Sequence, residues 1–501
     1  MEPRRWKISL RVVSLILILA AGLLTLNAFR EYRQTQAVLP ENSQWGVVHV
    51  GGLTLDQAQQ RVLAVYLSPF ELRYQGQIIH TPAEALGFSV IFLDGAQPQP
   101  KKSNFNSFWA YLWNDPQLVI EREIRFSLDE SQLRAYLQSE IANRYDVIPV
   151  PPFPIPASSR FSAGVSGRFL DIEASLVRFR AALSNPLERQ VDLIVQEQPM
   201  DWVDASLLKA VLMDELRKAN FNGIAEIYAY HLSKDQQVHF AVANGKEVPT
   251  DIAFSAASTI KIPILLTALM QVQPPFPDEF MRLSERMMVY SENPPADRIM
   301  EVYLGSTLAP LKVTEMLQKA GFQNTFLAGY FYLGAPLLQR FDTPANQRLD
   351  VNINPDVYNQ TTAGEMGRLL KEIYQCAVSE KGVFVETFPE EINAEKCDYL
   401  METMKRNRIG VLGEAGLPEG VPFAHKHGWT EESDGFLHTI SDAGIVFGPQ
   451  SDYVMVIFLY DPAQLLFEPA NALTARLSQR IFNAWNPDYQ IEWNFGEIRY
   501  R

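Results

Sequence analysis

The chain has 501 residues, a formal net charge of −14 and a hydrophobic fraction of 47%. At roughly 150 residues per domain this length suggests about three structural units, and the apolar fraction is too low for a protein that crosses a membrane many times. The acidic balance, with no Lys/Arg cluster beyond the N-terminus, excludes nucleic-acid binding as the main function.

Residues 1–30 are predicted to form an N-terminal transmembrane anchor. Basic residues precede an apolar run at residues 12–29 (VVSLILILAAGLLTLNAF), which is long enough to span a bilayer as a helix. Positive charge before the run predicts a single-pass protein of the cell membrane whose catalytic part is extracytoplasmic. The alternative is a cleaved secretory signal, which exports the rest of the chain equally.

A polar linker at residues 31–46 leads to an α+β domain predicted at residues 47–200. Thr54 is expected to cap a helix, Gln75-Gly76 to turn a hairpin, and Asp129 or Ser131 to cap the helix of a strand-to-helix unit at residues 126–142. A third unit is expected at residues 167–183. The proline-rich stretch at residues 148–156 (IPVPPFPIP) is predicted to be an extended loop inside this domain.

Three stretches of this domain, GGLTLDQAQQRV, LGF and GRFLDIEASLVRF, resemble the peptidoglycan-binding domain found beside L,D-transpeptidases and vancomycin-resistance-type proteins. The resemblance implies that residues 47–200 contact cell-wall peptidoglycan. The alternative is a generic α+β spacer that holds the rest of the chain away from the membrane.

Ser258 is the predicted nucleophile of a catalytic domain at residues 201–490, which a tail at residues 491–501 follows. In AFSAASTIKIPILLTALM, Ser258 and Lys261 lie one turn apart on an apolar helix, so the lysine amine can accept the serine proton. A second Ser-x-x-Lys copy begins at Ser206. It is interpreted as a helix N-cap followed by a surface lysine, because it lacks the buried helix.

Two further motifs follow. Ser291-Glu292-Asn293 in VYSENPPADRIM offers a second hydroxyl for proton transfer and an amide for binding a substrate carbonyl. In FAHKHGWTEES a strand is predicted to carry Lys426, whose charge attracts an anionic substrate group, followed by His427, Gly428 and Trp429. The glycine allows close approach of substrate backbone, and the Trp429 amide can donate to an oxyanion.

In this order the three motifs are the set described for class A β-lactamases and penicillin-binding proteins. Together with NQTTAGEMGRLL and DAGIVFGP, they resemble class A β-lactamase-like proteins. The resemblance implies an α/β (α+β) fold with an antiparallel sheet flanked by helices. It also implies catalysis by Ser258, Lys261 and Ser291, substrate binding by Asn293 and the residues 426–429, and no metal or organic cofactor.

The chain departs from this family at several positions. No glutamate occurs between Glu315 and Glu365, so the usual deacylation base is missing, and Asp342, Asp350 and Asp356 are the carboxylates available. His427 stands where the family has Thr or Ser and is expected to donate with a pH dependence near neutrality. The arginine that often binds the substrate carboxylate has no match, and His438 is the suggested substitute.

The expected function is a serine hydrolase that forms an acyl-enzyme with β-lactams or with D-alanyl ends of peptidoglycan. Three alternatives stay open: a D,D-peptidase without efficient β-lactam turnover, a non-hydrolytic penicillin- or peptidoglycan-binding sensor, and an unrelated esterase or amidase. The two cysteines, Cys376 and Cys397, are either bridged or separate thiols, since sequence does not fix their geometry.

Overall fold

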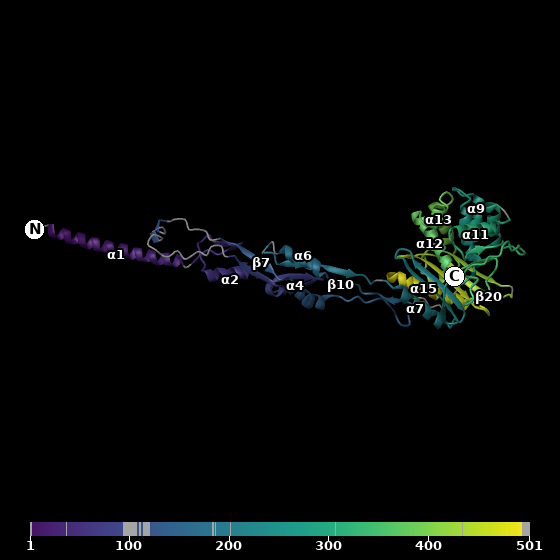
Figure 1. The fold of residues 1–501 in the computed structure, drawn as a ribbon, viewed down its shortest axis with the longest axis horizontal. Helices are drawn as coiled ribbons and strands as arrows, with labels where there is room; N and C mark the ends of the chain where they lie inside the picture. The colour runs from purple at the N-terminus through teal and green to yellow at the C-terminus, as the bar shows by residue number, and fades with distance from the viewer. Residues whose placement is uncertain are drawn as a thin grey trace. The chain divides into compact units, whose positions relative to one another are not determined.

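The structure is a computed structural model that describes residues 3–36, 38–93, 108–109, 112–113, 121–182, 185, 187–200, 202–305, 307–432 and 434–492. The chain divides into two compact units (Figure 1). The first comprises residues 1–149 and 166–199, and the second comprises residues 150–165 and 200–501. Most of the tail expected at residues 491–501 lies outside the described residues.

Helix α1 (Pro3–Gln36) contains one apolar segment long enough to cross a bilayer. This segment, Leu10–Gln34, has 25 residues and a mean hydropathy of 2.4. At 1.5 Å per residue its length of about 37 Å exceeds the ~30 Å hydrocarbon core. Length and composition fit a membrane anchor and a signal sequence alike, and the described residues contain no second such helix.

The remainder of the first unit is α+β, as expected. Its small sheets have the strand orders β2-β1-β6, β11-β3-β4, β5-β7 and β10-β12. The strands are β1 (Gln44–Trp45), β2 (Val48–His49), β3 (Phe70–Tyr74), β4 (Gln77–Thr81), β5 (Phe88–Phe92), β6 (Glu121–Arg122), β7 (Ile124–Leu128), β10 (Gly167–Leu170), β11 (Gln190–Asp192) and β12 (Val195–Gln198). The helices are α2 (Leu55–Tyr66), η1 (Ala83–Leu86), α4 (Glu130–Tyr136), η2 (Leu137–Ala142), α5 (Asn143–Tyr145) and α6 (Ile172–Ala182).

Local signals in this unit act as the sequence predicts. Thr54 caps α2 in a reciprocal capping box with Gln57. Gln75 and Gly76 both adopt positive φ, 49° and 79°, and turn the β3–β4 hairpin. Of the two cap candidates for α4, Asp129 accepts the backbone N–H groups that begin the helix.

A six-stranded antiparallel sheet forms the centre of the second unit, with the order β15-β14-β13-β21-β20-β19. Its strands are β13 (Ile224–His231), β14 (Gln236–Ala243), β15 (Lys246–Val248), β19 (Phe423–Glu431), β20 (Leu437–Phe447) and β21 (Asp452–Tyr460). Strands β13 and β14 form one antiparallel hairpin, and β20 and β21 form another. Strand β21 pairs with β13, so the two ends of the domain meet in mid-sheet.

Helices cover both faces of this sheet (Figure 1). Alternate β21 residues enter different cores: Val454, Val456 and Phe458 belong to one, and Met455, Ile457 and Leu459 to the other. On the second face lie α7 (Ala205–Lys218) and α15 (Phe467–Trp485), which packs through Leu473, Leu477 and Ile481. The expected α/β class with a helix-flanked antiparallel sheet is therefore confirmed.

The first face carries most of the helices. They are α8 (Lys261–Leu269), α9 (Asp278–Met288), α10 (Asn293–Ile299), η4 (Met300–Leu304), α11 (Ala309–Lys319), α12 (Ala363–Ser379), α13 (Val383–Thr387) and α14 (Ala394–Lys405). Shorter elements are β8 (Phe153–Pro154), β9 (Phe161–Ser162), β16 (Phe254–Ser255), η3 (Ala257–Ile260), β17 (Phe326–Leu327), β18 (Asn359–Thr361), η5 (Glu414–Gly416) and η6 (Pro487–Tyr489). A disulfide between Cys376 and Cys397 joins α12 to α14, which answers the question that the sequence left open.

The segment at residues 150–165 belongs to the second unit, although the sequence suggested a loop inside the first domain. Its short β8–β9 hairpin returns Ser159 toward the end of α15, where Asn483 Nδ2 donates to Ser159 O at 2.9 Å. Gln490 Nε2 donates to Phe161 O at 2.9 Å. These contacts lie more than 300 residues apart in sequence, which no local pattern reveals.

Candidate active site

The predicted nucleophile Ser258 lies in η3, directly before the buried helix α8. Strand β16 pairs with β18, and the Ala256 N–H donates to Asn359 O at 3.3 Å. Thr259 Oγ donates back to Ala256 O at 2.7 Å. Ala257 adopts a φ of 48°, a left-handed conformation that is strained for alanine and that the surrounding contacts must hold. All nine residues of α8 are buried, so the serine stands on a rigid support.

Lys261 is fully buried, and its amine contacts three oxygens. Nζ lies 3.0 Å from Ser258 Oγ, 2.7 Å from the Ser291 backbone oxygen and 2.7 Å from Asn293 Oδ1. Burial lowers the pKa of Lys261 to about 7, although nearby carboxylates oppose the shift. A neutral amine has two N–H bonds and one lone pair. The two carbonyl oxygens accept the N–H bonds, which leaves the lone pair for the serine proton.

Ser291 and Asn293 lie at the junction of α9 and α10. Ser291 has a φ of 57°, again in the left-handed region, and α10 begins at Asn293 with prolines in its first turn. This junction delivers the Ser291 backbone oxygen to one amine and its hydroxyl to another, because Lys426 Nζ donates to Ser291 Oγ at 2.8 Å. The structure thus brings Ser258, Lys261, Ser291 and Lys426 into one hydrogen-bonded group.

Lys426 is completely buried on the edge strand β19. Its Nζ also donates to His427 O at 2.9 Å. Burial and the neighbouring Lys261 hold the pKa of Lys426 well below its usual range, and Asp442 opposes them. Two buried amines one hydroxyl apart each favour the neutral form of the other.

Beneath β19 lies a buried polar network that the sequence did not indicate. His425 Nδ1 and Asp442 Oδ1 are 2.8 Å apart, both side chains are fully buried, and Asp442 Oδ2 accepts the Gly413 N–H at 3.0 Å. The other His425 nitrogen lies 3.0 Å from Asn407 O. This network fixes β19 from the side opposite the amine of Lys426. From sequence, the His425–Asp442 pair could be predicted only if the pairing of His425 with Gly444 across β19 and β20 were known, because Asp442 lies two residues from Gly444 on β20.

The expectation that His427 titrates near neutrality is wrong. Its side chain is buried, and burial together with the neighbouring Lys426, His425 and Lys261 side chains lowers the pKa of His427 to about 2. The imidazole is therefore neutral at physiological pH. Nδ1 lies 3.4 Å from Asn407 Nδ2, and the ring stacks on Trp429 with centroids 4.5 Å apart.

Gly428 marks the closest approach of β19 to the nucleophile. A Cβ atom at this position would lie 3.2 Å from Ser258 N and 3.1 Å from Ala256 O. The Ser258 amide therefore lies against the strand that continues to Trp429, whose ring packs edge-on against Phe467 at 5.4 Å.

His438 is not free to replace the absent arginine. Its Nε2 lies 2.8 Å from Asp434 Oδ2, and its Nδ1 lies 2.9 Å from Asp461 O. The Asp434 carboxylate raises the pKa of His438. Both nitrogens are thus engaged within the protein, so the suggested substitution does not hold.

Of the three aspartates that follow α11, Asp356 is the one tied to the nucleophile segment. Its N–H donates to Ser255 Oγ at 2.7 Å, and its Oδ2 accepts Asn359 Nδ2 at 2.9 Å. Asp350 pairs with Arg348 at 2.6 Å. Asp342 is exposed and accepts Gln347 Nε2 at 3.2 Å.

A pair of side chains near Lys261 was also missed from sequence. Asp297 Oδ1 accepts the Phe331 N–H at 2.8 Å, and the Phe331 ring centroid lies 5.4 Å from Lys261 Nζ. Burial raises the pKa of Asp297. This contact fixes the loop after β17 beside the site.

The second Ser-x-x-Lys copy lies apart from this constellation, on α7. Ser206 is exposed inside the helix, and Lys209 pairs with Glu247 at 2.5 Å. The N-cap is Asp204, which accepts the Leu207 N–H at 2.8 Å, so the expectation that Ser206 is the cap is wrong.

Residues 279–485 match the model of the beta-lactamase enzyme family, Beta-lactamase2. The match includes the second and third motifs and begins 21 residues after Ser258. The matched region lies within the C-terminal half of the chain. None of the curated proteins matches the chain.

Similar solved structures include PBP-A, with 19% identity, 56% of this chain and 96% of that chain covered and a TM-score of 0.38. A PBP-A mutant in an acyl-enzyme complex with penicillin G is 20% identical, with coverages of 56% and 97% and a TM-score of 0.39. A class A beta-lactamase from Bacteroides cellulosilyticus DSM 14838 is 18% identical, with coverages of 57% and 100% and a TM-score of 0.40.

Proposed function

We propose that the protein is a serine hydrolase in which Ser258 forms an acyl-enzyme with β-lactams or with D-alanyl ends of peptidoglycan stem peptides. The observation that carries the proposal is the Lys261 amine, which is buried, has a pKa of about 7 and lies 3.0 Å from Ser258 Oγ. At neutral pH a large share of this amine is unprotonated, so it can serve as the base that activates a serine.

In the acylation step, the Ser258 oxygen attacks the substrate carbonyl while its proton passes to Lys261 Nζ. The C–N bond then breaks, and Ser291 Oγ donates a proton to the leaving nitrogen. The proton that Lys261 took from Ser258 then restores the Ser291 hydroxyl, while Lys426 Nζ, 2.8 Å from Ser291 Oγ, stabilises that oxygen by its hydrogen bond. In net terms the Ser258 proton moves to the leaving nitrogen, and the reaction leaves an ester at Ser258 and a neutral amine.

Substrate orientation in this proposal comes from three groups around the serine. The Ser258 and Trp429 amides donate to the oxyanion, because β19 lies against the serine turn at Gly428. Asn293 binds a substrate amide carbonyl. A substrate carboxylate beside Lys426 would favour the protonated form of this amine and bind to it, and the neutral His427 acts as a hydrogen-bond donor there.

Slow deacylation is part of the proposal. The segment that carries a glutamate in class A β-lactamases has none here, and the acyl-enzyme is therefore expected to persist. Asp356 is the proposed base for the remaining hydrolysis, because its backbone N–H donates to Ser255 Oγ and its carboxylate accepts from Asn359, whose backbone oxygen accepts the Ala256 N–H.

The proposal places the catalytic domain outside the cytoplasm. The apolar segment Leu10–Gln34 would hold the chain in the cell membrane as a single-pass protein, and the first unit would contact peptidoglycan. Such a tether keeps a wall enzyme close to the membrane face where peptidoglycan is assembled.

Intact-mass measurement after incubation with benzylpenicillin tests the proposal. The full chain should gain one adduct of penicillin mass, Ser258→Ala should gain none, and Ser206→Ala should behave as the unaltered chain because it changes the other Ser-x-x-Lys copy. Turnover within seconds would identify a β-lactamase, and an adduct that lasts for hours would identify a peptidase or a sensor. An unlabelled chain with an intact fold would overturn the proposal.

A further inference from the structure

Glu226, His239 and Asp251 form a second titratable cluster, apart from the group around Ser258. Glu226 lies on β13 and His239 on β14. Because Tyr228 pairs with His239 and Glu226 pairs with Ala241, both side chains lie on one face of the sheet, two positions apart. Asp251 lies in the segment that leads to β16.

The Glu226 carboxylate is completely buried. It accepts the Asp251 and Ile252 N–H groups, both at 2.9 Å, and its Oε1 lies 2.8 Å from His239 Nε2. Among the described residues, His239 is the only side chain that forms an ion pair with it. A buried carboxylate is stabilised by donors or by a cation around it, and a metal ion bound beside His239 would supply such a cation.

Asp251 brings a second carboxylate to the same place. It adopts a φ of 61°, and its Oδ1 accepts Thr362 Oγ1 at 3.1 Å. Gly364 leaves room for the cluster, because a Cβ there would lie 2.5 Å from Asp251 Oδ1 and 2.9 Å from His239 Cε1. One ligand atom from each of the three residues lies within 4.8 Å of the others.

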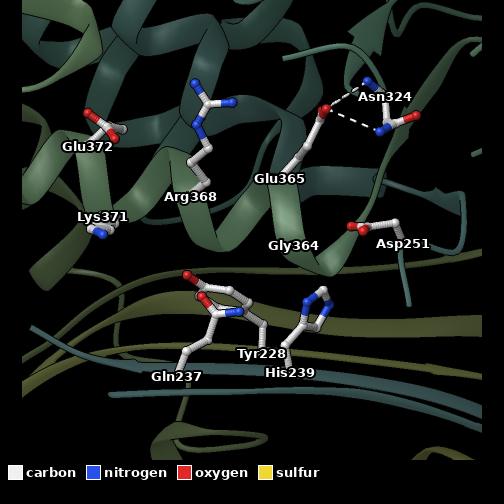
Figure 2. Close-up of a pocket in the computed structure, with 10 residues that line it drawn as sticks. All are labelled: Tyr228, Gln237, His239, Asp251, Asn324, Gly364, Glu365, Arg368, Lys371 and Glu372. Carbon is white, nitrogen blue, oxygen red and sulfur yellow. Dashed lines mark hydrogen bonds between the residues drawn. The ribbon is translucent and has the colours of Figure 1, made fainter. Parts of the chain in front are cut away.

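The cluster opens into a cavity of about 480 Å³. Figure 2 shows His239 rising from the sheet and Asp251 on the adjoining segment, both next to Gly364 at the start of α12. Lys371 and Gln237 line the part of the cavity farther along α12. Solvent in this cavity can complete the coordination of an ion whose protein ligands come from one side.

We propose that these residues bind one divalent metal ion of the Zn²⁺ class through His239 Nε2, Glu226 Oε1 and an Asp251 carboxylate oxygen. One imidazole and two carboxylates suit Zn²⁺, Co²⁺ or Mn²⁺, whereas Cu⁺ prefers sulfur. Ligand bonds of 2.0–2.2 Å in tetrahedral geometry separate ligand atoms by roughly 3.3 Å. The 2.8 Å pair of Glu226 and His239 opens by about half an ångström to admit the ion.

Arg348 is a cation near the proposed site, so its contacts must be compatible with a bound metal ion. Its guanidinium pairs with Asp350 and donates to the backbone oxygens of Pro249 and Thr250. It therefore holds the segment before Asp251 in place without occupying the three ligand groups. The bound ion would join β13, β14 and this segment, which reaches Ser258 seven residues later.

The test uses the full chain in detergent micelles, without a polyhistidine tag and after removal of metal with a chelator. Calorimetric titration with ZnCl₂ should give one ion per chain and a rise of several degrees in the unfolding midpoint. Co²⁺ should produce a visible absorption band. His239→Gln and Asp251→Asn should each weaken binding at least tenfold.

His438→Gln is the matched control, because His438 also pairs with a carboxylate at 2.8 Å but, among the described residues, belongs to no group of three metal-ligating side chains. Benzylpenicillin labelling of Ser258 reports whether each variant is folded. Absence of binding at millimolar Zn²⁺, or equal binding by the His239→Gln and His438→Gln variants, would overturn the proposal. Should His239→Gln fail to fold, the exposed Asp251→Asn variant decides the same question.

Discussion

The three hydrogen-bond partners of Lys261 Nζ explain how this buried amine is prepared for proton transfer. The Ser291 and Asn293 oxygens at 2.7 Å only accept hydrogen bonds, whereas the Ser258 hydroxyl at 3.0 Å can also donate. Deprotonation therefore leaves no unsatisfied group, and burial supplies the free energy that shifts the pKa to about 7.

The rate of acylation should follow the ionisation of Lys261. Because burial lowers the pKa of this cation, the amine is neutral above about pH 7 and charged below it. The second-order rate constant for fluorescent-penicillin labelling should thus rise tenfold per pH unit up to about pH 7 and then level off. Lys261→Ala should lose roughly 10²–10⁴-fold in rate, and Lys209→Ala should lose none. A flat profile between pH 5 and 9 would contradict this assignment.

Removal of the Asp356 carboxylate should prolong the acyl-enzyme. Asp356 is bonded to Ser255 and Asn359 beside the nucleophile segment, so Asp356→Asn keeps the shape and removes the base. We expect the lifetime of the penicillin adduct, followed by intact mass, to increase at least tenfold. Asp342→Asn is the control, since that side chain is exposed. Equal lifetimes in both variants would exclude Asp356 as the base.

For individual residues, short sequence motifs predict most of the candidate site. The remaining contacts join residues that are far apart in the sequence. The spacing of Ser258 and Lys261 places them on one helical turn, so their contact could be predicted. The burial that lowers the His427 pKa, and the His425–Asp442 pair below it, depend on what packs over β19. The residues next to His427 in the sequence do not indicate what packs over β19.

At the scale of an element, the edge strand β19 leaves little room for a side chain at Gly428. Gly428→Ala would place a methyl group 2.8 Å from Ser441 Oγ and against the Ser258 turn. Ser441 is buried, so the strand must move, at a cost of about 1–3 kcal/mol. The labelling rate should fall by tenfold or more while the chain stays folded, as measured by thermal unfolding.

Gly435→Asn provides the comparison for this strand. Gly435 lies in the following turn, has a φ of 81°, and a Cβ added there would meet no atom within 4 Å. Asparagine tolerates such a φ better than other side chains. The labelling rate of this variant should match that of the unaltered chain. If both variants label equally, close packing at Gly428 does not govern acylation.

Elements with strong periodicity were the predictable part of the fold. Strands β20 and β21 are long and apolar, and α15 repeats its buried residues at helical spacing, so their type and partners follow from pattern. The sequence pattern predicts Ser206 as the N-cap of α7, whereas the structure has Asp204 at that position. Both residue types favour the N-cap, and only the backbone conformation decides between them.

For the whole chain, the apolar N-terminus should remain attached in the mature protein. The segment Leu10–Gln34 is long enough to span the bilayer, and basic residues precede it. Protein extracted from membranes should have the mass of the uncleaved chain and resist carbonate washing. A chain that lacks residues 1–36 should be released by the same wash. A mature protein that begins after residue 30 would identify a cleaved signal instead.

The return of residues 150–165 to the second unit makes this unit discontinuous in the gene. Ser159 and Phe161 are hydrogen-bonded to the end of α15 and to the chain that follows it. A truncation at residue 200 would therefore remove a segment that belongs to the second unit. Recombination or truncation at a single point therefore cannot exchange this unit cleanly. Residues 150–165 and 200–501 would have to be inherited together, or other residues would have to replace the contacts with α15.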